Sequence, residues 1–229
     1  MLDFTGVQAL TFDCYGTLID WETGLLAALR RALGPNSTRV PDEALLNLFA
    51  WLEARGERGQ YRSYRVVLRD VLGRMGEVFN TPIREPDALA ESIRAWPAFA
   101  DTAASLAALK TRFRLCIVSN IDDDLFVMSR PRLGVALDQV VTAQQVGSYK
   151  PRKAHFREAL RRLGLETGQV VHVAQSLYHD IAPAREMGLR TVWVNRQAGR
   201  PGATPPNKAA PELEVPDMET LARLVAPSK

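Results

Sequence analysis

LTFDCYGTLID, residues 10–20, joins an apolar run to a carboxylate, a glycine turn and a hydroxyl. The apolar residues before Asp13 predict a buried β-strand, and Gly16 predicts a turn directly after it. In open parallel sheets, ligands bind beyond the carboxyl ends of the strands. Asp13 therefore stands where such a sheet would carry a reactive group.

Short apolar, β-branched runs recur along the chain, with helical stretches between them. Runs that are buried on both faces and separated by helices are typical of a parallel, doubly wound α/β sheet. Asp101 is expected to cap a helix over residues 101–110, while Gly164 and Gly188 end helices that begin near residues 153 and 180. The expected strands are VQALTF (7–12), RLCIVS (114–119), QVV (139–141), QVVHVA (169–174) and RTVWVN (190–195).

The segment between about Leu18 and Ala95 has a different pattern, because every apolar repeat in it has helical spacing. We therefore expect a helical domain, residues 18–95, inserted after the first strand of a core formed by residues 1–17 and 96–229. Its expected helices contain LLAALRRAL (25–33), EALLNLFAWLEA (43–54), YRSYRVVLRDVLGRM (61–75) and DALAESIRAW (87–96).

The last part of the chain, residues 195–217, is rich in Pro and Gly and is expected to be mostly loop. Glu212 to Val215 form a possible short edge strand, and a closing helix is expected after Asp217. We find no internal repeat in the sequence.

The composition excludes several classes of protein. With 46% hydrophobic residues among 229, the chain can bury a substantial core, and no apolar run approaches the ~20 residues that cross a membrane. We expect a cytoplasmic protein whose two cysteines, Cys14 and Cys116, are reduced thiols in the core. The net charge of +3 comes from arginines spread over many expected helices, so no nucleic-acid partner is indicated.

Polar side chains follow the expected strands at the points where each strand ends. Ser119 and Asn120 follow the second strand, and the fourth is followed by the stretch QSLYHD, residues 175–180. Lys150 lies in the loop QQVGSYKP, residues 144–151, ahead of a helix. Four separate segments thus bring polar groups to one edge of the sheet, where Asp13 is expected.

Four motifs together resemble the haloacid dehalogenase superfamily and, within it, the type II or (S)-2-haloacid dehalogenases. They are FDCYGTLID (12–20), VSN (118–120), SYKP (148–151) and HVAQSLYHD (172–180), in the expected order and separation. The resemblance spans nearly the whole chain and implies that the helical insert is a cap domain above a hydrolase core.

The resemblance also implies catalytic roles for four residues. Asp13 would be the nucleophile, Thr17 would hold one of its oxygens, and Lys150 would favour its ionised form. Asp180 would orient Lys150 or the attacking water. Each residue also has a plain structural reading: Asp13 as a turn residue, Thr17 and Asp180 as helix caps, and Lys150 as a solvated surface lysine.

Further residues would bind the substrate or activate water. Hydrogen bonds from Ser119 and Asn120, and from backbone N–H groups around Cys14 and Tyr15, would hold the substrate carboxylate or an oxyanion. Water activation is left open between Asp180 and Lys150, with His179 as a further candidate. The expected substrate-binding residues are Cys14, Tyr15, Ser119, Asn120, Gln175 and Ser176.

Two positions separate this chain from the phosphatases of the superfamily. Phosphatases carry a second acid two residues after the nucleophile, which protonates the leaving alkoxide, and here that position is Tyr15. Gln175 stands where phosphatases have another acid that binds Mg²⁺. A halide leaves without a proton, so the resemblance implies a metal-independent dehalogenase of small 2-haloacids, with no cofactor and no metal site.

The sequence leaves several alternatives open. The first is a Mg²⁺-dependent phosphatase acting on a small phosphate ester, and the second is a catalytically silent binding fold. Type II enzymes use a cap arginine to hold the halide, for which Arg55 and Arg58 are possible substitutes, and Phe156 replaces a family tyrosine. A homodimer is an expectation from the resemblance alone. An aromatic wall could be supplied by Trp21, Trp51 and Tyr61.

Overall fold

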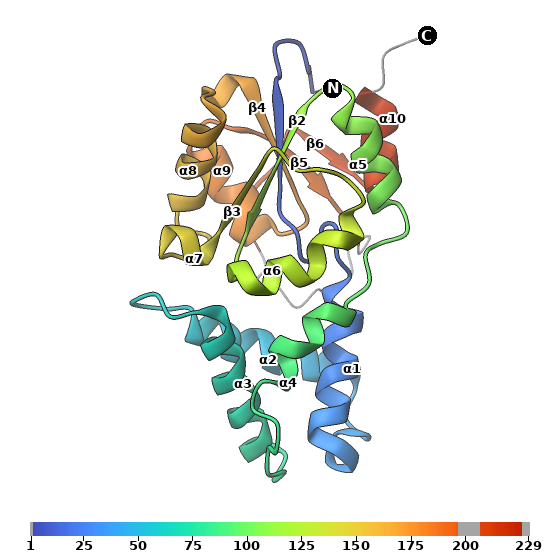
Figure 1. Ribbon diagram of the computed structural model, residues 1–229, viewed down its shortest axis with the longest axis vertical. Coiled ribbons are helices and arrows are strands. Elements are labelled where there is room, and N and C mark those ends of the chain that lie inside the picture. Colours follow the sequence, from blue (N-terminus) through green and yellow to red (C-terminus); the bar gives the residue numbers. More distant parts are fainter. Residues whose placement is uncertain (1, 197–206, 226–229) are drawn as a thin grey trace.

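The computed structural model describes residues 2–196 and 207–225. Its centre is a six-stranded, all-parallel sheet with strand order β3-β2-β1-β4-β5-β6 (Figure 1). The α/β fold class predicted from the sequence is confirmed, including the short edge strand. The strands are β1 (Ala9–Phe12), β2 (Arg114–Ser119), β3 (Gln139–Thr142), β4 (Val170–Ala174), β5 (Arg190–Val194) and β6 (Leu213–Val215).

Helices cover both faces of the sheet. In Figure 1, α8 and α9 lie on one side and α5 and α10 on the other. Strand residues such as Cys116 and Val118 pack against α8, in a core cluster separate from the main one. No helix in the described residues is both long and apolar enough to cross a membrane. These helices are α5 (Thr102–Lys110), α6 (Asp123–Ser129), α7 (Ala143–Val146), α8 (Ala154–Leu163), α9 (Ala182–Glu186) and α10 (Met218–Val225).

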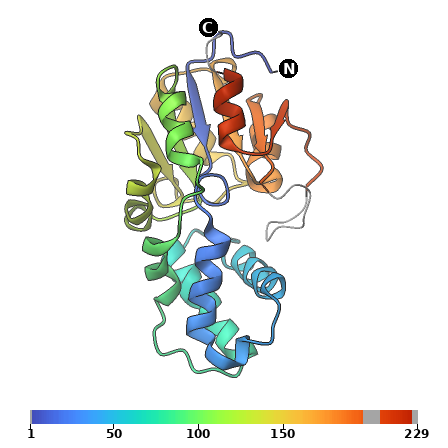
Figure 2. The same ribbon diagram turned by 90° about the vertical axis from the view of Figure 1, so that its right-hand side faces the viewer.

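The inserted helices form a second lobe, the cap, at one end of the sheet (Figures 1 and 2). Two adjacent links join the cap to the core: Asp20 N–H donates to the Pro97 carbonyl at 2.8 Å, and Ile19 pairs with Ala98 in an isolated bridge. The cap helices are α1 (Trp21–Leu33), α2 (Asp42–Gly56), α3 (Tyr64–Val78) and α4 (Ala88–Ser92).

Three helix starts differ from the sequence prediction. Helix α3 begins at Tyr64 rather than residue 61, because the Ser63 hydroxyl caps it by accepting from Val66 N–H. Asp101 precedes α5 but does not cap it with its side chain, since its carboxylate binds Arg196 and Met218 N–H. The helix expected from residue 180 begins as a π-helical turn at 177–181, followed by α9.

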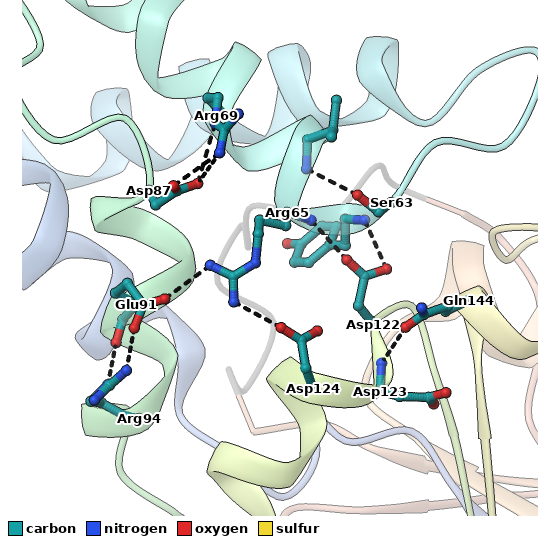
Figure 3. Close-up of polar contacts among 12 residues, drawn as sticks. Ser63, Arg65, Arg69, Asp87, Glu91, Arg94, Asp122, Asp123, Asp124 and Gln144 are labelled. Atoms are coloured by element: carbon teal, nitrogen blue, oxygen red, sulfur yellow. Dashed lines mark hydrogen bonds and ion pairs between the residues drawn. The ribbon is translucent and has the colours of Figure 1, made fainter.

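The segment that follows β2 in the core forms hydrogen bonds and an ion pair with the cap. The Asp122 carboxylate accepts hydrogen bonds from the backbone N–H groups of Tyr64 and Arg65, each at 2.9 Å, at the start of α3 (Figure 3). The Arg65 guanidinium reaches Glu91 of α4 at 2.9 Å and Asp124 of α6 at 2.8 Å. The same loop carries Ser119 and Asn120, so the cap is fixed to a segment of the expected site.

Candidate active site

Asp13, Lys150 and Asp180 form a buried charged triad at the ends of the strands. Lys150 Nζ lies 2.8 Å from Asp13 Oδ1 and 2.7 Å from Asp180 Oδ1, and it donates a third hydrogen bond to the Val118 carbonyl at 2.9 Å. Lys150 is only 2% exposed, so its ammonium group is shielded from solvent. One ammonium group thus contacts two carboxylates.

Thr17 fixes the second oxygen of the Asp13 carboxylate. Its hydroxyl donates to Asp13 Oδ2 at 2.9 Å and accepts from Gln175 N–H at 2.9 Å. Because Gly16 takes a positive φ of 97°, the chain turns sharply after Tyr15 and brings Thr17 back to the carboxylate. Both oxygens of Asp13 are therefore oriented by the protein.

The protonation states of the triad follow from burial and charge together. Burial raises the pKa of Asp13 and the Asp180 carboxylate adds to this effect, while the Lys150 ammonium opposes it. Burial also disfavours the charge on Lys150, but the two carboxylates override it and raise the pKa of the ammonium. Burial alone would raise the pKa of Asp180, yet Lys150 and His172 lower it to about 2.

Asn120 positions Lys150 through the backbone. Its side-chain oxygen accepts from Lys150 N–H at 2.7 Å, and its amide nitrogen donates to the Lys150 carbonyl at 3.2 Å. The Ser119 hydroxyl is buried, and no group in the described residues hydrogen-bonds to it. Ser119 thus keeps a free donor at the end of β2, whereas the amide of Asn120 is occupied.

A histidine behind Asp180 belongs to the site and was missed by the sequence analysis. His172 Nε2 lies 3.0 Å from Asp180 Oδ1, and His172 Nδ1 lies 2.9 Å from the Thr11 hydroxyl. Phe156, the residue that replaces a family tyrosine, meets the His172 ring edge-on at 5.0 Å between centroids. His172 is a buried residue of β4. It lies in an apolar run, and the residues next to it in the sequence do not predict a contact with Asp180.

A cavity of about 80 Å³, here called the chamber, lies between the triad and the cap. The cap contributes Trp21, Glu53, Glu57 and Tyr64, and Trp96 lies where the cap rejoins the core. Of these five, only Trp21 was predicted. The core contributes Asp13, Tyr15, Ser119, Asn120, Lys150, Ser176, His179 and Asp180.

Two chamber residues from the core have oriented polar atoms. The Tyr15 hydroxyl lies 3.0 Å from the Ser129 hydroxyl, and its ring packs edge-on against Trp96 at 5.6 Å. The Ser176 hydroxyl accepts from His179 N–H at 3.0 Å, which holds the π-helical turn in place. Burial lowers the pKa of His179 to about 4, so its ring is neutral near pH 7.

Several predicted contacts lie away from the chamber. The Cys14 side chain is fully buried in the apolar core. The Gln175 side chain sits beside Gly16, and its backbone carbonyl accepts from Trp193. Neither residue lines the chamber.

Apart from Trp21, the cap residues suggested as halide or aromatic contacts lie outside the chamber. Trp51 is 57% exposed and stacks under the Arg55 guanidinium, 4.8 Å from the ring centroid. Arg58 is exposed as well. The Tyr61 hydroxyl donates to Asp122 at 2.8 Å and supports the cap–core contact instead. A larger hollow of about 830 Å³ is lined entirely by cap residues between 24 and 95.

The donor set does not fit a divalent cation. Mg²⁺ needs several free oxygen ligands, yet both oxygens of Asp13 are hydrogen-bonded and the Lys150 ammonium stands between Asp13 and Asp180. Tyr15 and Gln175 occupy the positions where acids would be needed. Within the described residues, no group of three His, Cys, Asp or Glu side chains is arranged to hold a metal.

Comparisons with known proteins found both dehalogenases and phosphatases among the relatives. An (S)-2-haloacid dehalogenase from Burkholderia cepacia is 27% identical over 207 residues, which cover 85% of this chain and 86% of the relative. A glyceraldehyde 3-phosphate phosphatase from Methanothermobacter thermautotrophicus is 34% identical over 102 residues, covering 43% of this chain and 45% of the relative.

A solved structure of similar fold is the L-2-haloacid dehalogenase from Xanthobacter autotrophicus with chloropropionic acid covalently bound. It superposes with a TM-score of 0.80 at 21% identity, over 97% of this chain and 100% of that chain. The family model of haloacid dehalogenase-like hydrolases matches residues 7–188. This match covers most of the chain, including the cap, the triad and the chamber, and the protein therefore belongs to the haloacid dehalogenase-like hydrolases.

Proposed function

We propose that this hydrolase cleaves the carbon–halogen bond of small 2-haloacids, such as haloacetate or (S)-2-halopropionate, through an ester on Asp13 and without a metal. The observation that carries the proposal is the environment of Asp13. Its carboxylate is held by Lys150 and Thr17, while Tyr15 stands where a phosphatase would need its second acid. This arrangement suits a leaving group that departs without a proton.

The first step is a displacement at carbon. An oxygen lone pair of ionised Asp13 attacks the halogen-bearing carbon, the C–O bond of an aspartyl ester forms, and the carbon–halogen electron pair leaves with the halide. The Lys150 ammonium opposes the effect of burial on the pKa of Asp13 and favours its ionised form. The free hydroxyl of Ser119 is available to the substrate carboxylate at the end of β2.

The second step is hydrolysis of the ester. Water attacks the Asp13 carbonyl carbon and a base takes one of its protons. The bond to the product oxygen then breaks, and the second water proton passes to that oxygen, which releases a 2-hydroxyacid and restores the carboxylate. Between the candidate bases, the observations favour His179 over Asp180. The pKa of His179 is lowered to about 4 by burial, but that of Asp180 lies near 2 and its Oδ1 already accepts from Lys150 and His172.

The relatives support this proposal over the phosphatase alternative. The Burkholderia enzyme is a named (S)-2-haloacid dehalogenase that aligns over most of both chains, and the Xanthobacter structure carries its chloropropionic acid covalently. The phosphatase relative favours the alternative, but it aligns over less than half of this chain. The donor set described above also offers a phosphate ester no place for Mg²⁺.

The test is halide release in the presence of EDTA. The purified protein is incubated with chloroacetate, fluoroacetate and each enantiomer of 2-chloropropionate, and Asp13→Asn is run in parallel. We expect halide release by the wild type and a loss of about a thousandfold or more in Asp13→Asn, because the amide is a poor nucleophile. Turnover of phosphate esters only when Mg²⁺ is added, with no halide released, would instead establish the phosphatase.

A further inference from the structure

The cap side of the chamber carries two acids and no base. Glu53, in the last turns of α2, and Glu57, directly after that helix, both line the chamber opposite the triad. Together with Asp13 and Asp180 they place four carboxyl groups around one ammonium, that of Lys150. Among the described residues, no cation forms an ion pair with either glutamate.

This charge distribution conflicts with the binding of an anionic substrate if both glutamates are ionised. A 2-haloacid enters as a carboxylate, and the halide is a second anion formed within the same small space. Like charges at such distances repel strongly where water is excluded. The chamber can therefore admit a haloacid readily only if its cap side is neutral.

The surroundings of Glu53 hold its carboxyl in one orientation. The Tyr64 hydroxyl donates to Glu53 Oε1, and Tyr64 is itself fixed because its backbone N–H donates to Asp122. Figure 3 shows this anchoring of the start of α3 by Asp122. In the described residues the Glu53 side chain has no other hydrogen bond, so its second oxygen is free to carry a proton.

The charged and titratable groups around Glu53 come from several elements. They are Glu57 beyond α2, Tyr64 on α3, Tyr149 and Lys150 before α8, Asp13 after β1, and His179 and Asp180 in the π-helical turn. Burial raises the pKa of Glu53 to about 7, although the hydrogen bond from Tyr64 opposes the rise. Burial and the neighbouring Glu53 also raise the pKa of Glu57 well above its ordinary value.

We propose that Glu53 is the cap residue that contacts the anionic substrate, and that it does so as a neutral acid donating a hydrogen bond in place of a cation. The inference rests on the proposed function for the identity of the substrate. The site would then accept haloacids at pH values at which the Glu53 carboxyl is neutral, and it would exclude them at higher pH. Burial and the neighbouring Glu53 favour the neutral form of Glu57 as well.

The test measures binding without chemistry. Propionate has the carboxylate and size of the substrate but no halogen, so it binds without reacting, and its affinity is measured by calorimetry from pH 6 to 9. The wild type is compared with Glu53→Gln, whose amide is a neutral donor of the same shape. Glu43→Gln is the matched control, because Glu43 lies exposed in the first turn of the same helix.

We expect wild-type affinity to fall about tenfold per pH unit above about 7, as one proton is linked to binding, and Glu43→Gln to behave likewise. Glu53→Gln should bind propionate with nearly constant affinity over the same range. Tyr64→Phe should move the wild-type midpoint upward, because the lost hydrogen bond stabilised the ionised form.

Constant wild-type affinity, or an unchanged decline in folded Glu53→Gln, would overturn the inference. Tighter binding of ethylammonium than of propionate throughout the range would also overturn it, since the cap side would then be a cation site. Halide release is measured separately. If propionate binding follows Glu53 while no haloacid is hydrolysed, the inference on the binding residue stands and the proposed reaction fails.

Discussion

The two sides of the chamber differ in how their charges are balanced. On the core side, Lys150 contacts Asp13, Asp180 and the Val118 carbonyl within 2.9 Å, so both carboxylates share one cationic partner. On the cap side, Glu53 and Glu57 are half-buried acids without a cation among the described residues. The difference agrees with the proposals that the core side carries out the reaction and that the cap side selects the substrate.

The origin of the two sides explains this contrast. The core residues stand at the ends of parallel strands, which fix their positions through the sheet. The cap residues belong to an inserted helical lobe. Two adjacent chain segments connect this lobe to the core, and Asp122 of the core hydrogen-bonds to the start of α3. Substitutions in the cap therefore alter access and selectivity with less effect on the reactive group.

Lys150→Met is expected to have the largest effect, because it removes the partner of two buried carboxylates. Loss of one member of a buried ion pair costs about 3–5 kcal/mol of the free energy of unfolding. In the variant, burial keeps both acids more protonated in the folded than in the unfolded chain, so its stability should fall as pH rises from about 4 to 8. Urea unfolding at several pH values measures this.

Lys153→Met is the matched control, since Lys153 pairs with Glu186 at the surface and such pairs contribute at most about 1 kcal/mol. Equal losses in the two variants would show that the Lys150 ammonium does not stabilise the two buried carboxylates.

His179→Gln is the second variant, and it separates the two chemical steps on the core side. Removing a general base slows the step it serves by about a hundredfold or more. We expect a rapid burst of about one halide per enzyme, followed by slow turnover and accumulation of the Asp13 ester, detected by mass spectrometry of the intact protein. A slow release with no burst would place His179 in the displacement step or assign water activation to another group.

Gly24→Ala tests the cap side and should have the smallest effect. A Cβ on Gly24 would overlap the Trp96 ring, which lines the chamber where the two lobes join. Overpacking of this kind costs about 1–3 kcal/mol. Thermal unfolding and the KM for haloacid should both change, whereas kcat should change little.

The control is Gly73→Ala in α3, where an added Cβ meets nothing within 4 Å and alanine favours the helix. A lower stability of the control than of Gly24→Ala would contradict the packing described at Trp96.

The strands and the core side of the site were predictable from the sequence for one physical reason. Asp13, Ser119 and Asp180 follow short apolar runs, and parallel strands bring their carboxyl ends to the same edge. Lys150 could be included in the predicted site because SYKP, residues 148–151, occurs together with the other three motifs of the family. Thr17 lies four residues after Asp13, and the intervening turn determines the contact between them.

The cap side could not be predicted in the same way. From the sequence, Glu53 and Glu57 would be taken for solvated residues of a helical segment that also exposes Trp51. Only the packing of the cap against the core places both glutamates in the chamber with Asp13. His172 had no local signal either, since its partners Thr11 and Asp180 come from other segments. Contacts between lobes, and between distant strand residues, depend on tertiary packing that periodicity does not encode.

The most direct measurement of the central claim is a single turnover of chloroacetate in water labelled with ¹⁸O, with enzyme in excess. If Asp13 attacks carbon, the hydroxyl oxygen of the product comes from its side chain and the solvent oxygen replaces it. We expect ¹⁸O in the peptide that contains Asp13 and unlabelled glycolate. Labelled glycolate with an unlabelled Asp13 peptide would mean that water attacks the substrate directly and that Asp13 is not the nucleophile.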